Sequence, residues 1–146
     1  VVDKEHKIFL IGCFITVSVI AYLLNWNFDS MADTATTLVS IAVGVYIAAA
    51  SALLGSPYAK ELKQTTDKKR TSNTLLGTLL DYFRHAGKLG ITTVIVSCLY
   101  KIPATYNVPI IIARIGSAAA YGIFFCNILF LWLVFVFLVN SIEKSV

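Results

Sequence analysis

The stretch that decides the fold class is IGSAAAYGIFFCNILFLWLVFVFLV, residues 115–139, which contains no charged side chain. At about 1.5 Å of rise per residue, a helix over this run is longer than the ~30 Å hydrocarbon core of a bilayer. Charged residues return only at Glu143 and Lys144. We therefore predict that the run crosses a membrane as a tilted helix.

The rest of the chain repeats this pattern of long apolar runs between short charged blocks. It is 58% hydrophobic and 14% charged, whereas a soluble domain carries about 25% charged residues. We predict one transmembrane domain over residues 1–146, with spans at about 8–26, 35–55, 86–103 and 115–139. The first run is longer than the ~7–15-residue apolar core of a signal peptide, so we interpret it as a true span.

The third span is the shortest of the four. Lys88 and Lys101 bracket only Leu89–Tyr100, about 18 Å of helix. Either both lysines extend to the membrane surfaces or the bilayer thins. The following apolar piece, residues 102–113, carries two prolines and is interpreted as an outer loop, with a re-entrant segment as the alternative.

A polar segment, residues 57–88, separates the second span from the third. Its second part, residues 74–88, predicts an amphipathic helix at the membrane interface that runs directly into the third span. The apolar face comprises Leu75, Leu76, Leu79, Leu80, Phe83 and Ala86, and the polar face Asp81, Arg84, His85 and Lys88. The predicted fold class is all-α, a polytopic membrane protein with four transmembrane helices plus this interfacial helix.

The lysines and arginines set the predicted orientation. With the amino terminus inside, only Lys101 and Arg114 of the 12 basic residues lie outside. The first outer turn contains Asp29 and Asp33 and no basic residue. Because cytoplasmic loops are enriched in lysine and arginine, we predict that both termini are cytoplasmic.

Small residues mark two helix faces for close packing. In the second run they recur at steps of four, and in the fourth run they occupy the first half. Small side chains let helix backbones approach where lipid supplies no hydrophobic drive between helices. We interpret these faces either as packing within one monomer or as an oligomer interface. The residues are Ser40, Gly44, Ala48, Ala52, Gly116, Ala118 and Gly122.

Asn127 lies at the midpoint of the fourth run. An amide facing lipid there is unfavourable, so it is predicted to hydrogen-bond another helix or to line a wet cavity. In a ring of subunits, Asn127 becomes a candidate pore constriction, and Thr93 and Ser97 of the third span are candidates to join it.

The basic residues next to the spans have two interpretations. They form a solvated loop that fixes topology, or they bind anionic lipid headgroups or a cytosolic protein. Nucleic acid is not a predicted direct partner, because the positive charge lies beside apolar spans. The residues concerned are Lys60, Lys63, Lys68, Lys69, Arg70, Arg84 and Lys88.

Catalytic signatures are not found in the sequence. Cys13, Cys98 and Cys126 each lie alone in an apolar run, so neither a thiol oxidoreductase nor a metal site is indicated. The four runs carry no acidic residue, which argues against a proton-coupled pump. We predict no enzyme activity, no cofactor and no metal.

The chain resembles a known class in the order of its segments. Leu53-Leu54-Gly55 ends a small-rich span, a basic loop follows, and Leu79-Leu80-Asp81-Tyr82-Phe83-Arg84 leads into a short third span. Over residues 35–100 this is similar to small multi-spanning membrane proteins of bacterial anti-phage defence systems, such as retron-associated or Kiwa-type membrane subunits. The resemblance implies a bacterial cytoplasmic (inner) membrane and assigns no functional residue.

Two functions remain as hypotheses. The first is a homo-oligomer that acts on the bilayer as a membrane-perturbing or channel-like effector or sensor. The second is a membrane anchor or sensor subunit that recruits a cytosolic partner through its basic loop. The first rests on the small-residue faces and Asn127, and the second on the charge of residues 57–88.

Overall fold

The computed structural model describes residues 4–67, 70–102 and 109–143. Three of its helices are long and apolar enough to cross a membrane, which supports the prediction of a membrane protein. They are α1, α2 and α5. The elements are α1 (Lys4–Leu23), α2 (Asp29–Leu54), α3 (Tyr58–Gln64), β1 (Thr66–Asp67), β2 (Arg70–Thr74), α4 (Leu75–Tyr100) and α5 (Ile110–Glu143).

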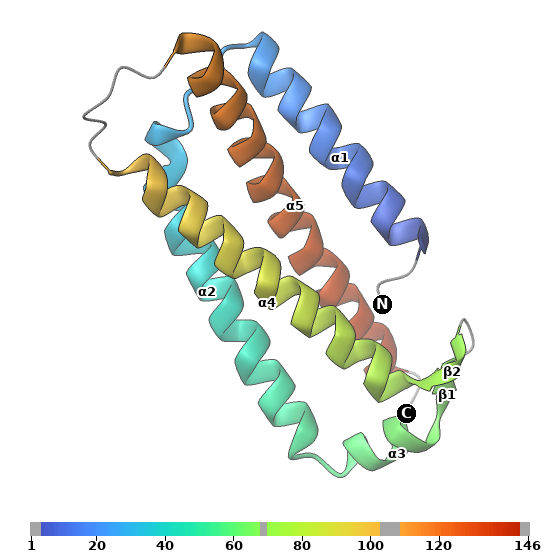
Figure 1. Ribbon diagram of the computed structural model, residues 1–146. Helices are drawn as coiled ribbons and strands as arrows, with labels where there is room; N and C mark the ends of the chain where they lie inside the picture. Colours follow the sequence, from blue (N-terminus) through green and yellow to red (C-terminus); the bar gives the residue numbers. More distant parts are fainter. Residues whose placement is uncertain (1–3, 68–69, 103–108, 144–146) are drawn as a thin grey trace.

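The four long helices run side by side (Figure 1). α5 packs against both α1 and α4, and α4 packs in turn against α2. The helices therefore follow the spatial order α1, α5, α4, α2, with α5 and α4 inside and α1 and α2 on the flanks. The flanking helices present most of their side chains outward, because each has one main neighbour.

The two ends of the bundle differ. The start of α1, the end of α5, α3 and the β1–β2 pair lie together at one end (Figure 1), which we call the hairpin end. The α1–α2 turn, the end of α4 and the start of α5 lie at the other, which we call the turn end. An even number of long helices returns the chain to the end where it began.

Asn25 follows the end of α1 at Leu23 and sets the turn into α2. Its φ is 54°, a left-handed conformation that asparagine tolerates better than most residues. The amide of Trp26 donates to the carbonyl of Ala21 (3.0 Å) and that of Asn25 to the carbonyl of Tyr22 (3.3 Å). This paired arrangement satisfies carbonyls that the helix leaves free at its end.

The segment predicted as an interfacial helix running into the third span forms the first half of α4. Thr74 caps this helix, since its Oγ1 accepts a hydrogen bond from the amide of Gly77 at 3.2 Å. From there α4 continues without a break to Tyr100, so residues 74–88 point along the bundle together with the third span. Their apolar face packs on α2 and α5, and Leu79, Phe83 and Ala86 are buried.

Two further boundaries differ from the sequence-based prediction. α5 begins at Ile110, inside the piece predicted as an outer loop. The carbonyl of Pro109 accepts from the amides of Ile112 (2.9 Å) and Ala113 (3.1 Å), and proline suits a helix start because it has no amide hydrogen to satisfy. α2 likewise begins earlier, at Asp29. Residues 103–108 of the predicted loop lie outside the described residues.

The basic loop contains a short antiparallel strand pair that the all-α prediction lacked. Thr66 pairs with Thr74 and Asp67 with Arg70. The carbonyl of Thr65 also accepts from the amide of Leu75 at 3.0 Å, which joins the base of the hairpin to the start of α4. The described part of the loop is thus folded against the start of α4.

Aromatic and small side chains fill the interior in two clusters. Near the turn end, Phe28 is fully buried and its ring meets those of Tyr100 and Tyr121 at centroid distances of 5.3 and 5.2 Å. Near the hairpin end, Tyr82, Phe83 and Phe130 form the second cluster. Large apolar side chains elsewhere point outward, such as Ile8 at 70% and Ile41 at 61% exposure. Hydrocarbon around the bundle accounts for this surface, because water would disfavour it.

Candidate functional site

A polar contact between α5 and α4 occupies the interior. The side chain of Asn127 is buried, and its Nδ2 donates to Thr93 Oγ1 at 2.6 Å. Thr93 Oγ1 in turn donates to the carbonyl of Leu89 at 2.9 Å. The threonine hydroxyl therefore uses its hydrogen within α4 and offers a lone pair to the amide of α5.

Ser97, the other residue predicted to join Asn127, is fully buried one helical turn beyond Thr93. Its Oγ has no hydrogen-bond partner among the described residues. All three predicted polar residues thus lie inside one chain. A ring of Asn127 side chains around a shared axis would require α4 and α5 to separate.

The small residues of α5 are used for packing inside the monomer. A Cβ on Gly122 would meet Ser18 Oγ and would lie 2.8 Å from a ring carbon of Phe14, both on α1. A Cβ on Gly116 would lie 2.7 Å from Tyr100 Oη of α4. Ala118 is buried in the cluster near the turn end. Close approach of α1 and α4 to α5 depends on these positions.

Gly90 of α4 has the same role and was missed by the sequence reasoning. A Cβ there would collide with Val43 Cγ2 and would lie 3.4 Å from Val39 Cγ1, both on α2. This glycine lets α4 and α2 cross closely. The only sequence signal was a glycine within a span, and it carried no information about the partner helix.

The predicted small-residue face of α2 points outward. Ser40, Gly44, Ala48 and Ala52, which we call the open stripe, are all exposed. The side chains that α2 buries lie on another face, at Ala32, Ala35, Val39, Ala42 and Tyr46. A Cβ on Gly44 would meet no heavy atom of the described residues within 4 Å. The open stripe is therefore free to contact a helix of another molecule.

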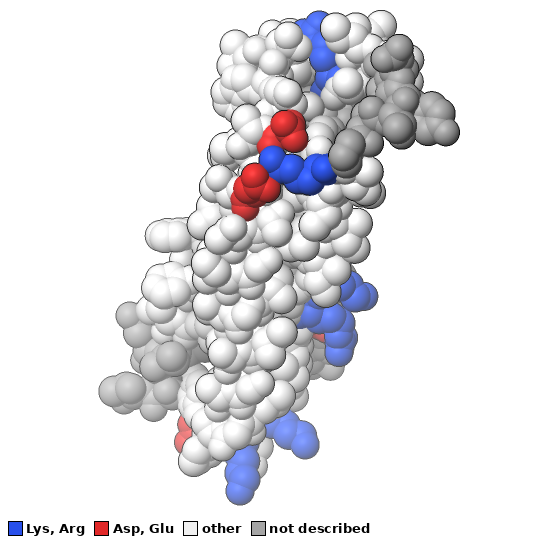
Figure 2. Space-filling model, turned by 90° about the vertical axis from the view of Figure 1, so that its left-hand side faces the viewer, with Lys and Arg blue, Asp and Glu red and all other residues white. Residues whose placement is uncertain are grey.

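Most of the described basic residues lie toward the hairpin end of the bundle. Lys60 and Lys63 are exposed on α3, and Arg84 and Lys88 are exposed on the half of α4 nearer the hairpin end. Arg84 pairs with Asp81 at 3.1 Å. Arg70 begins β2, while Lys68 and Lys69 lie outside the described residues. Figure 2 shows a broad uncharged surface between the Lys and Arg atoms of the lower part and a mixed charged cluster above.

The two cations at the turn end, Lys101 and Arg114, have partners. Lys101 Nζ lies 3.0 Å from Asp33 Oδ2 and 3.7 Å from Asp29 Oδ1. The hydrogen bond to Asp33 raises the pKa of Lys101. Arg114 Nη2 donates to the carbonyl of Tyr22 at 3.2 Å, and its guanidinium lies 5.0 Å from the centre of that ring. These contacts join α4 to α2 and α5 to α1, and the sequence pattern did not predict them.

Comparison with known proteins adds no family to this description. No family model, curated protein or solved structure matches the chain. Within the described ranges, no three His, Cys, Asp or Glu side chains are grouped so that they would hold a metal ion. Function is therefore inferred from the helix surfaces and the charges at the two ends.

Proposed function

We propose that this chain is a four-span protein of a bacterial cytoplasmic membrane that self-associates through the open stripe of α2 and acts on the bilayer. The observation that carries the proposal is the exposure of Ser40, Gly44, Ala48 and Ala52. In hydrocarbon there is no hydrophobic drive between helices, and small residues promote association by allowing close backbone contact. The setting in anti-phage defence is the one that the sequence resemblance implies.

α4 provides the fourth crossing in this proposal. Its 26 residues give about 39 Å of helix, and it lies beside two helices that are apolar enough to span. Lys101, which brackets its apolar part, is compensated by Asp29 and Asp33. Pairing lowers the cost of holding this charge near the hydrocarbon. Lys88 brackets the other side from an exposed position, where its side chain reaches the headgroups.

The hairpin end faces the cytoplasm in the proposal. Lys60 and Lys63 lie at this end, and Arg84 and Lys88 lie in the nearer half of α4. Lys101 and Arg114 lie at the turn end. Cysteine-accessibility labelling of α3 from the two sides of intact cells tests the orientation. Labelling from the periplasmic side would contradict it.

Self-association is tested at Gly44. The purified protein in mild detergent is expected to have the mass of an oligomer, and Gly44→Ile is expected to reduce it to a monomer because the side chain separates the backbones. Gly12→Ile is the matched control, since Gly12 also has no described heavy atom within 4 Å of a Cβ position but lies outside the stripe. A monomeric mass for the unchanged chain would overturn the proposal.

Action on the bilayer is tested by membrane potential in cells that express the chain. We expect depolarisation, either from the chain alone or after addition of a native trigger. Gly44→Ile is expected to abolish the depolarisation, and cells with Gly12→Ile are expected to depolarise as before. Because Asn127 is paired inside one chain, any aqueous path in this proposal lies between subunits. A potential that stays unchanged with and without the native partner would count against this function.

The second candidate function is recruitment of a cytosolic protein. It is favoured by the folded state of the basic loop, in which Ala59 and Leu62 are buried while Lys60 and Lys63 point outward. A structured surface costs less ordering entropy on binding than a free loop. Neutralising Lys60, Lys63, Lys68, Lys69 and Arg70 together is expected to release a partner, whereas Lys101→Gln at the other end is not. Co-purification that survives this change at raised salt would exclude electrostatic docking there.

A further inference from the structure

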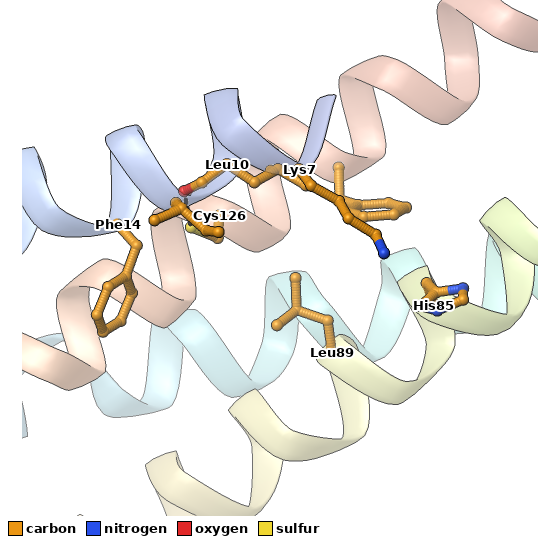
Figure 3. A pocket seen from close by; sticks show the side chains of 8 residues that line it. Lys7, Leu10, Phe14, His85, Leu89 and Cys126 are labelled. Carbon is orange, nitrogen blue, oxygen red and sulfur yellow. Dashed lines mark hydrogen bonds between the residues drawn. The ribbon is translucent and has the colours of Figure 1, made fainter. Parts of the chain in front are cut away.

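A groove runs between α1 and α4 with α5 as its floor (Figure 3). It forms because α1 and α4 both pack on α5 and have little contact with each other. At the hairpin end the two are joined by a hydrogen bond of 2.6 Å between His6 Nδ1 and Tyr82 Oη. The cavity volume is about 360 Å³, within the range of small-molecule sites.

The walls of the groove are apolar along most of its length. α1 supplies Leu10, Ile11 and Phe14, α4 supplies Leu89, and α5 supplies Cys126 and Phe130. The one polar group among these six side chains is the Cys126 thiol, which donates to the carbonyl of Leu10 at 3.4 Å. Nothing along these walls would hold water in place, so a hydrocarbon chain is the suitable filling.

One end of the groove is cationic. Lys7 of α1 and His85 of α4 line it, and Figure 3 shows Lys7 extending towards His85. His85 Nδ1 is 2.7 Å from the carbonyl of Asp81, so Nδ1 carries a hydrogen. Nε2 then donates to a phosphate oxygen when the ring is doubly protonated, and the Lys7 ammonium is the permanent cation at this end. The carboxylate of Asp81 is engaged by Arg84, and Lys88 adds a further exposed cation on α4.

We propose that the groove binds one anionic phospholipid, with an acyl chain against Leu10, Phe14, Leu89 and Phe130 and the headgroup phosphate on Lys7 and His85. An amphiphile with an anionic head and at least one long acyl chain matches both parts. A helix of a second copy would leave the cationic end without a partner, and a free anion would leave the apolar walls unfilled.

The position of the cationic end along the bundle fits a phospholipid headgroup. Lys7 lies in the first turn of α1, at the hairpin end. Only the choice of leaflet rests on the proposed orientation. With the hairpin end in the cytoplasm, the lipid comes from the cytoplasmic leaflet, which contains anionic lipids. Lys60, Lys63 and the hairpin are not among the residues that line the groove, so it is a different site from the basic loop.

The test measures lipid adducts by native mass spectrometry of the full chain in detergent. Phosphatidylglycerol and phosphatidylcholine with identical acyl chains are added separately. We expect one phosphatidylglycerol per chain, bound in preference to phosphatidylcholine. Lys7→Gln and His85→Gln should each lower that preference, roughly fivefold for the lysine. Leu89→Trp, which fills the groove, should remove binding of both lipids.

Lys101→Gln is the matched control, because it removes one positive charge at the other end and should leave the preference unchanged. Equal binding of the two lipids, an equal loss with Lys101→Gln, or displacement of the lipid by inorganic phosphate alone would overturn the inference. A disulfide between Leu10→Cys of one copy and Leu89→Cys of another would also overturn it, because a second copy would then occupy the groove. A monomer that binds one phosphatidylglycerol would contradict self-association and leave the lipid site standing, because Gly44 is remote from the groove lining.

Discussion

α5 and α2 carry similar small residues and use them in different ways. On α5, Gly116 and Gly122 are places where a neighbouring helix comes so near that a methyl group would not fit. On α2, Gly44 meets open space and Ser40 is exposed. The first set holds the monomer together, and the second is unused within it.

The difference follows from position in the bundle. α5 lies between α1 and α4, so several of its faces are covered, whereas α2 has α4 as its main neighbour. A small-residue pattern shows that a helix is suited to close packing. It does not show whether the partner helix belongs to the same chain. The same substitution made in each helix therefore distinguishes packing within the monomer from contact between molecules.

The largest effect is expected from Gly122→Ala against Gly44→Ala. The added methyl at Gly122 must displace Phe14 and Ser18, and such overpacking costs typically 1–3 kcal/mol. At Gly44 the same change meets open space and gains helix propensity of up to ~1 kcal/mol. Thermal unfolding of the monomer, in a detergent that keeps the subunits apart, should thus shift in opposite directions. Equal shifts would show that the two glycines do not differ in packing.

A smaller effect is expected at the hydrogen bond between Asn127 and Thr93. A double-mutant cycle with Asn127→Ala and Thr93→Val should give a coupling energy of about 0.6 kcal/mol and at most ~1.7, as for other polar contacts between membrane helices. Reversible unfolding in mixed micelles provides the measurement. Ser40→Ala, a hydroxyl loss on the open stripe, should show no coupling with Asn127→Ala. Additive effects of the first pair would mean that the contact is not formed in the membrane.

The smallest effect is expected at the ion pair between Lys101, after the end of α4, and Asp33 of α2. The hydrogen bond to Asp33 raises the pKa of Lys101 above its ordinary value of 10.5. A cation stabilised in the folded state contributes stability below the unfolded pKa and loses it as the pH rises through the folded pKa. Thermal stability should therefore fall above about pH 10.5 by more in the unchanged chain than in Lys101→Gln. Parallel curves would show that this ion pair contributes nothing.

The sequence predicted the helices better than their limits. The runs at 8–26, 35–55 and 115–139 correspond to α1, α2 and α5, although each observed helix starts earlier than predicted. Asp29 and Ile110 were left out because charge and proline were taken as span limits, whereas backbone geometry lets a helix extend beyond the hydrocarbon. Residues 74–88 were predicted as a helix at the interface. Their continuation into the third span was predicted, but only the structure shows that they pack on α2 and α5 as part of the bundle.

The sequence identified polar and small residues but not their partners. Asn127 and Thr93 were singled out, yet their mutual hydrogen bond depends on the rotation of α5 against α4. Lys101 and Asp33 were both assigned to the outer side, and their ion pair arises because the end of α4 meets the start of α2. The groove with Lys7 and His85 had no sequence signal, because its residues come from three helices.

The sequence by itself determined that hydrocarbon surrounds this chain, because long uncharged runs must satisfy their backbone polar groups as helices in lipid. It also determined which residue types are available for helix contact. Only the tertiary structure decided the order of the helices across the bundle, and with it which small faces are covered and where a groove is left. The reason is that apolar helices fit many neighbours almost equally well in lipid, so steric fit at positions such as Gly90 and Gly122 selects among them.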